Sequence, residues 1–87
     1  MCHRFIVKGR VQGVFFRASA RDIAVKIGLN GWVKNLNDGS VESLACGDAK
    51  QIEEYRRWLN QGPKFANVTT VEELVVTCSV QSSFEIT

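Results

Sequence analysis

The sequence predicts an α+β fold of the ferredoxin-like type, in which a mainly antiparallel sheet carries two helices on one face. Short runs with the alternation of strands are separated by two segments of helical period, in the order βαββαβ plus a short extra C-terminal strand. Right-handed crossovers place both helices on the same face. A helix crosses from the first strand to the second, so these two are parallel. The third strand lies between them and pairs antiparallel with the first.

The first strand and the helix after it are predicted from two different periods. Arg4 to Lys8 alternates as a strand does, with Phe5 and Val7, and then Val11, directed toward the core. A segment of helical period runs from Arg17 to Ile27, and its apolar stripe, which starts at the preceding residue, comprises Phe16, Ala20, Ile23, Ala24 and Ile27. Gly28 is the expected left-handed stop of this helix.

A hairpin is predicted after the first helix. Leu29 to Asn35 has the pattern of the second strand, and Ser40 to Cys46 has that of the third. The turn sequence between them is Asn37-Asp38-Gly39, in which Gly39 supplies a positive φ.

The second half of the chain begins with another helix. Asp48 is its expected N-cap, and Gln51, three residues later, completes a capping box. Its apolar stripe contains Ile52, Tyr55 and Leu59, and Gly62-Pro63 ends it. The remaining segments are a long β-branched strand over Asn67 to Val76, a polar connection over Thr77 to Ser83, and a short strand over Phe84 to Ile86.

Composition limits the classes of partner. An apolar content of 45% and a charged content of 23% are typical of a globular protein, and 87 residues allow one domain, residues 1–87. The net charge of +2 is too small to indicate nucleic acid or a membrane as a partner. No apolar run is long enough to span a bilayer, and we recognise no signal peptide. A cytoplasmic monomer is therefore the default expectation.

Metal and cofactor chemistry is not indicated by the residue types. The three cysteines match no metal-site spacing, Cys-x-x-Cys is absent, and His3 is the only histidine. These counts disfavour both a zinc site and a Cys/His nucleophile pair. We therefore expect neither a metal nor a cofactor.

Two of the cysteines are predicted to face each other. Cys2 opens the first strand and Cys46 closes the third, and these strands are expected to be antiparallel neighbours. We therefore hypothesise a Cys2–Cys46 disulfide. The alternative is two free thiols, which are the usual state in a cytosolic protein. Cys78 lies in the polar connection and is expected to be unpaired.

The loop from Gly9 to Arg17 joins the first strand to the first helix and is the candidate binding site. Gly9 and Gly13 bracket a turn that leaves backbone N–H groups unpaired at the positive end of the helix dipole. Such a loop suits an anion such as phosphate, and Arg17 can hold two oxygens of the same anion. The alternative is a tight turn with an exposed arginine. Neither familiar glycine-rich nucleotide-binding motif is present.

Two segments resemble the acylphosphatase family. The first is Gly9-Arg10-Val11-Gln12-Gly13-Val14-x-Phe16-Arg17, and the second is Gly28-Leu29-x-Gly31-Trp32-Val33-x-Asn35-x-x-Asp38-Gly39-x-Val41-Glu42. The resemblance spans about Phe5 to Ile86 and implies the same ferredoxin-like fold. It also implies hydrolysis of an acyl phosphate, a carboxyl–phosphate mixed anhydride, to carboxylate and inorganic phosphate. Phosphate or sulfate is then the expected product-like ligand, and no metal or cofactor is required.

The resemblance also implies roles for single residues. Arg17 would clamp the phosphate, and Asn35 would orient the attacking water. The phosphate would also be held by the backbone amides of Val11, Gln12, Gly13, Val14, Phe15 and Phe16. We assign Asn37, the competitor of Asn35, to the turn. Of the two nearby carboxylates, we assign Asp38 to the turn and Glu42 to an outward strand position, which leaves no protein base. The water's proton is then expected to pass to a phosphate oxygen of the substrate.

Two positions depart from the family pattern. Some members carry a hydroxyl residue directly after the asparagine, where this sequence has Leu36, so an auxiliary hydrogen bond from that position is absent. Many members end in a basic or aromatic residue that ties down the last strand. This sequence ends in Thr87, which leaves the anchoring of that strand open.

Two other functions remain open, because ferredoxin-like sandwiches serve several purposes. An RNA-recognition domain needs exposed aromatic residues on its central strands. The third strand has none: one face presents Val41, Ser43 and Ala45, and the other presents Glu42, Leu44 and Cys46. A non-catalytic domain that binds or senses phosphate or another small anion would share the loop and Arg17. It would bind phosphate without hydrolysing acyl phosphates.

Overall fold

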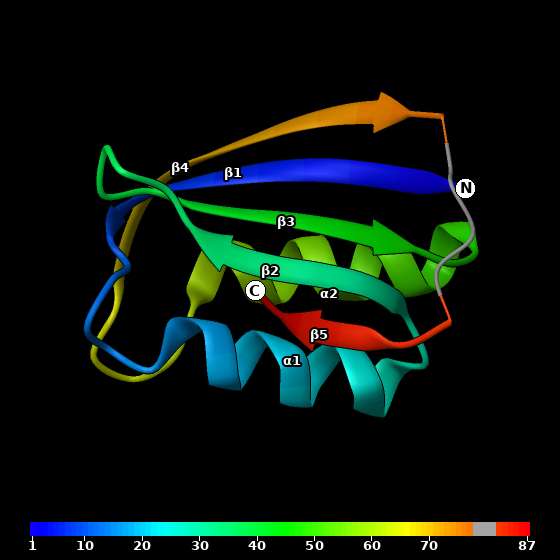
Figure 1. Cartoon of the computed structure of the whole chain (residues 1–87), viewed down its shortest axis with the longest axis horizontal. Coiled ribbons are helices and arrows are strands. Elements are labelled where there is room, and N and C mark those ends of the chain that lie inside the picture. The colour runs from blue at the N-terminus through cyan, green and yellow to red at the C-terminus, as the bar shows by residue number, and fades with distance from the viewer. Residues whose placement is uncertain (78–81) are drawn as a thin grey trace.

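The computed structural model describes residues 1–77 and 82–87, which form a five-stranded sheet with two helices on one face (Figure 1). The sheet order is β4-β1-β3-β2-β5. The elements are β1 (Cys2–Arg10), α1 (Phe16–Ile27), β2 (Asn30–Asn35), β3 (Val41–Cys46), α2 (Ala49–Gln61), β4 (Asn67–Val76) and β5 (Phe84–Ile86). The predicted α+β ferredoxin-like fold, with its extra C-terminal strand, is confirmed.

Three strands of this sheet run in the same direction. β3 pairs antiparallel with both β1 and β2, so β1 and β2 are parallel to each other. β5 pairs parallel with β2, whereas the edge strand β4 is antiparallel to β1. The carboxyl ends of β1, β2 and β5 therefore lie at one end of the sheet, where the chain leaves β1 to enter α1 (Figure 1).

The core lies between the sheet and the helices, as the two periodic stripes predict. Phe16, Ala20 and Ala24 of α1 are buried, while Ile23 and Ile27 of the same stripe pack partly buried at its edge. All three predicted stripe residues of α2 are buried. The sheet's contribution is the residues that point toward the helices, which include Phe5, Val7, Val33, Val41 and Ala45.

The ends of several elements differ from the sequence prediction by a few residues. β1 extends beyond the predicted Arg4 to Lys8, because β3 and β4 both pair with it from Cys2 and β4 alone continues to pair with it as far as Arg10. β2 begins at Asn30, because the N–H of Leu29 still donates to the carbonyl of Ala24 at the end of α1. β3 begins at Val41, one residue later than predicted.

The predicted helix ends are confirmed. Asp48 caps α2 through its side chain, and the Gln51 side chain reaches back to the Asp48 N–H at 2.9 Å, which completes the capping box. Gly28 closes α1 in the left-handed conformation, with φ at 100°. Gly62 ends α2. In the described ranges no helix combines the length and the apolar character needed to cross a bilayer.

A buried hydrogen-bond chain fixes α2 to the middle of the sheet. The Ser43 hydroxyl donates to the Trp32 carbonyl at 2.9 Å and lies 2.8 Å from the Tyr55 hydroxyl. Because the serine has one proton, the tyrosine must be the donor in the second bond. Burial raises the pKa of Tyr55 well above its ordinary value, so the phenol stays protonated.

Replacing Ser43 should show how much this hydrogen-bond chain contributes to the free energy of unfolding. In Ser43→Ala the Tyr55 hydroxyl stays buried without its acceptor, and we expect the free energy of unfolding to fall by about 1–3 kcal/mol. Tyr55→Phe removes the donor instead, and the double variant should be destabilised by less than the sum of the single changes. Urea unfolding of the four proteins checks this, and strict additivity would contradict the hydrogen bond between the Ser43 and Tyr55 hydroxyls.

Cys2 and Cys46 are cross-strand partners in the β1–β3 pairing, with Cα atoms 4.1 Å apart, and the structure joins their sulfurs in a disulfide. This bridge lies at the amino end of β1, the end of the sheet opposite the β1–α1 loop. We therefore propose that the oxidised protein carries this cross-link. The expectation for Cys78 falls outside the described residues, 1–77 and 82–87.

Alkylation followed by mass measurement tests the disulfide. Unreduced protein should take up one alkyl group, and fully reduced protein should take up three. Uptake of three groups before reduction would rule the bridge out. Because the closed loop spans 44 residues, reduction should lower the free energy of unfolding by about 3–4 kcal/mol on the chain-entropy model. The Cys2→Ser/Cys46→Ser double variant should show the reduced stability with or without reductant.

Candidate active site

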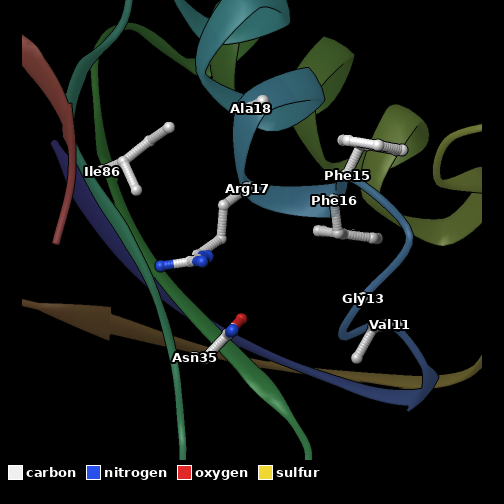
Figure 2. Close-up of a pocket in the computed structure, with 8 residues that line it drawn as sticks. All are labelled: Val11, Gly13, Phe15, Phe16, Arg17, Ala18, Asn35 and Ile86. Carbon is white, nitrogen blue, oxygen red and sulfur yellow. The ribbon is translucent and has the colours of Figure 1, made fainter.

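A cavity of about 280 Å³ opens where the carboxyl ends of β1, β2 and β5 meet the amino end of α1 (Figure 2). Ligands in α/β folds commonly bind at such a position, because several strand ends and a helix dipole face the same space. The residues that line the cavity are Val11, Gly13, Phe15, Phe16, Arg17, Ala18, Asn35 and Ile86.

The β1–α1 loop starts from a backbone irregularity at Gly9. The register of β1 against β4 shifts between Lys8 and Gly9, and Gly9 has φ at 126°. A Cβ at this position would collide with the carbonyl oxygen of Asn67 on β4. Only glycine fits here, and the bulge turns the chain away from the sheet toward α1.

The amino end of α1 has no protein cap. Its N-cap residue, Phe15, makes no side-chain hydrogen bond to the helix, and the first turn contains no acidic residue. Gly13 (φ 74°) and Phe15 (φ 62°) both adopt the left-handed conformation, which turns successive N–H groups of a loop toward a common point. The first amides of α1 are therefore available to an anion.

The Arg17 side chain lies over this cavity and points toward Asn35 (Figure 2). Its Nη1 donates to the carbonyl oxygen of Thr87, directly after β5, at 3.4 Å. A cation in the first turn of a helix opposes the helix dipole unless an anion lies between them. The position of Arg17 is thus the one that a bound anion would stabilise.

Asn35 reaches the same cavity from the sheet. It is the last residue of β2 and lies two positions after the buried Val33, so it shares the face of the sheet that the helices cover. Its exposed carboxamide points toward the Arg17 guanidinium (Figure 2). Asn37, the other asparagine considered from the sequence, lies in the turn and does not line the cavity.

Among the predicted phosphate-binding residues, Val11, Gly13, Phe15 and Phe16 line the cavity. Gln12 and Val14 do not. Val14 is buried, with its side chain in the hydrophobic core. The sequence interpretation also omitted Ile86, which β5 brings to the cavity by pairing in parallel with β2.

The side chain of Gln12 has a function that sequence reasoning missed. Its Nε2 donates to the carbonyl oxygens of Leu36, at 2.7 Å, and of Ser40, at 2.9 Å. These two carbonyls belong to the β2–β3 connection that follows Asn35 directly. Gln12 therefore ties the loop that approaches Arg17 to the hairpin that carries Asn35. No local pattern indicates this contact, because its partners are 24 and 28 residues away.

The carboxylates of Asp38 and Glu42 form hydrogen bonds and ion pairs outside the cavity. Asp38 Oδ1 accepts hydrogen bonds from both the N–H and the hydroxyl of Ser40, and these bonds hold the pKa of Asp38 below its ordinary value. Glu42 pairs with Arg4 at 2.8 Å and with Lys34 at 3.5 Å. Neither carboxylate lines the cavity. Within residues 1–77 and 82–87, no cluster of three or more His, Cys, Asp or Glu side chains is arranged to hold a metal.

Comparison with known proteins agrees with this architecture. The family model of acylphosphatase matches residues 3–86. An acylphosphatase of Nitrosococcus oceani is 44% identical over 85 residues, which cover 98% of this chain and 96% of the relative. The solved acylphosphatase of Coxiella burnetii superposes with a TM-score of 0.95 at 42% identity, over 99% of this chain and 90% of that one.

A second solved acylphosphatase, from Bacillus subtilis, also superposes with a TM-score of 0.95, at 37% identity. The match covers 99% of this chain and 97% of that one. The shared length leaves neither protein with a large unmatched part. Sequence and fold agree along the whole molecule, and the chain belongs to the acylphosphatase family.

Proposed function

We propose that this protein hydrolyses the carboxyl–phosphate bond of acyl phosphates and releases a carboxylate and inorganic phosphate. The observation that carries this proposal is the convergence of the Arg17 guanidinium and the Asn35 carboxamide on one cavity at the uncapped start of α1 (Figure 2). The family membership gives the reaction class, and these residues supply a way to perform it.

In this proposal the phosphoryl group binds in the β1–α1 loop. Backbone N–H groups of Val11 to Phe16 donate to its oxygens, and the planar guanidinium of Arg17 donates to two of them. The fold holds these N–H groups and the guanidinium in place before the substrate arrives. Little reorganisation of the donors is therefore needed as negative charge develops on the equatorial phosphate oxygens. The anion also offsets the unfavourable position of Arg17 in the helix dipole.

Asn35 then holds a water molecule in line with the bond that breaks. The water oxygen forms a new bond to phosphorus, the bond from phosphorus to the acyl oxygen breaks, and the electron pair leaves with the carboxylate. One water proton passes to a phosphate oxygen, so the products are the carboxylate and dihydrogen phosphate. The carboxylate is a good leaving group, which is why positioning and charge stabilisation suffice without a protein base.

Replacement of each side chain should separate binding from turnover. Arg17→Ala is expected to abolish phosphate binding and hydrolysis together, because the side-chain cation that lines the cavity is lost. Asn35→Ala is expected to keep phosphate binding and to lower kcat by about 10²–10³-fold, as for one lost oriented polar group. Hydrolysis of benzoyl phosphate and competitive inhibition by inorganic phosphate measure the two effects.

Asn37→Ala is the matched control, since Asn37 is an exposed asparagine two residues from Asn35 that does not line the cavity. It should retain near wild-type kcat. Full turnover in Arg17→Ala or Asn35→Ala would overturn the residue assignment. Phosphate binding by the wild-type protein without hydrolysis would instead favour a non-catalytic anion-binding domain.

Gln12 is expected to act as a positioning residue. In Gln12→Leu the two hydrogen bonds to the hairpin are lost, and kcat should fall about tenfold or more, the effect of roughly 1.4 kcal/mol. The inhibition constant of phosphate should change less than about threefold, because Arg17 and the amides remain. Steady-state kinetics at a temperature where the variant is fully folded separates this effect from a loss of stability.

A Gln12→Glu variant gives a second readout of the same contact. The ionised carboxylate has no proton to donate to the carbonyls of Leu36 and Ser40, whereas the protonated carboxyl group donates one hydrogen bond. The kcat of this variant, relative to wild type, should therefore rise as the pH falls through the pKa of the new carboxyl. Gln12→Leu should show no such rise. Equal pH profiles would contradict the role of Gln12.

A further inference from the structure

Phe15 presents an aromatic ring to solvent at the mouth of the cavity. Its side chain is 79% exposed, whereas the adjacent Phe16 is 2% exposed and lies in the core. Phe15 is also the only residue other than glycine with a positive φ within the described ranges. A bulky side chain in the left-handed conformation is strained, and a glycine would shape the loop without this strain. Neither packing nor backbone geometry accounts for a phenyl ring here.

Ile86 forms a second exposed apolar surface of the same cavity. It is 36% exposed and comes from β5, on the side of Arg17 opposite Phe15 in Figure 2. Ala18, in the first turn of α1, adds a smaller apolar contact next to Arg17. The other apolar lining residues, Val11 and Phe16, are almost fully buried. Exposed apolar surface is thus gathered around the proposed phosphate position.

The cavity is larger than a phosphate ion requires. If each heavy atom takes the volume of a water molecule in the liquid, about 30 Å³, the five heavy atoms of phosphate fill at most about 150 Å³. The cavity measures about 280 Å³. The cavity therefore has room for more of the substrate than its phosphoryl group.

We propose that Phe15 and Ile86 bind the acyl group of the substrate and select bulky apolar acyl groups, aromatic or branched, over the acetyl group. This inference rests on the proposed hydrolysis of acyl phosphates and adds the class of substrate. An apolar acyl group buries its own surface together with the exposed ring of Phe15 and the methyl groups of Ile86, and a bulky group buries more of this surface than an acetyl group does. The strained backbone of Phe15 serves both purposes: its amide belongs to the phosphate loop and its ring reaches the acyl group.

The experiment compares kcat/KM for benzoyl phosphate and acetyl phosphate in wild type, Phe15→Ala and Ile86→Ala. We expect the benzoyl-to-acetyl ratio to fall about tenfold in Phe15→Ala and about threefold in Ile86→Ala. The inhibition constant of inorganic phosphate should change less than about twofold. Intrinsic differences between the two leaving groups cancel, because every variant is measured on both substrates.

Phe65→Ala is the matched control. Phe65 is also an exposed phenylalanine, at 66%, but it does not line the cavity. Its replacement should leave the ratio at the wild-type value. Phe15→Trp keeps an aromatic wall and should keep the preference, which guards against an effect of loop distortion alone. An unchanged ratio in both alanine variants of the cavity would overturn the inference.

Two stable analogues separate this inference from the proposed function. Phenacylphosphonate and acetonylphosphonate replace the bridging oxygen of benzoyl phosphate and acetyl phosphate with carbon, so they bind without being hydrolysed. Titration calorimetry should show tighter binding of the phenacyl compound to wild type and loss of that preference in Phe15→Ala. If wild type hydrolyses neither acyl phosphate, the proposed function fails while this measurement still decides the acyl site. Equal affinity of wild type for both analogues would refute it.

Discussion

The uncapped amino end of α1 is the constraint on which the rest of the site depends. Helices usually satisfy their first N–H groups with a side chain of their own, and here the N-cap residue is Phe15, which has no such group. The left-handed conformations at Gly13 and Phe15 and the cation at Arg17 all surround this deficit. The left-handed conformation of Phe15 and the position of Arg17 are unfavourable alone, and an anion in the loop would compensate for both.

Binding an anion is not sufficient for hydrolysis, because the attacking water must be held by a different part of the chain. The phosphate loop follows β1, whereas Asn35 ends β2, and these strands are separated in the sheet by β3. The Gln12 side chain spans this separation with two hydrogen bonds to the hairpin. These bonds of the half-buried Gln12 amide hold the two halves of the site at a distance that the fold determines, so the halves do not behave as independent loops.

The molecule separates its stabilising contacts from its chemistry. The Cys2–Cys46 bridge and the capping box of α2 lie toward the end of the sheet opposite the cavity, while the Tyr55–Ser43 chain lies beneath α2. The cavity end instead contains less favourable features. Phe15 has a strained backbone and an exposed ring, and Arg17 lies at the amino end of α1, where the helix dipole disfavours a cation. Strain of this kind persists only where the surrounding structure holds it, which here is the well-packed core under Phe16.

Local patterns in the sequence determined the elements, their order and the approximate place of the site. The apolar stripe of α1, the turn at Gly39 and the Asp48–Gln51 capping box each depend on residues a few positions apart. They can therefore be predicted from the sequence without knowledge of the fold. The bonds from Gln12 to the hairpin, the contact of Arg17 with Thr87 and the place of Ile86 were decided only by the tertiary structure. The reason is physical: each joins segments far apart in the chain, and the pairing of β5 with β2 and the crossover through α1 must form before those side chains have neighbours.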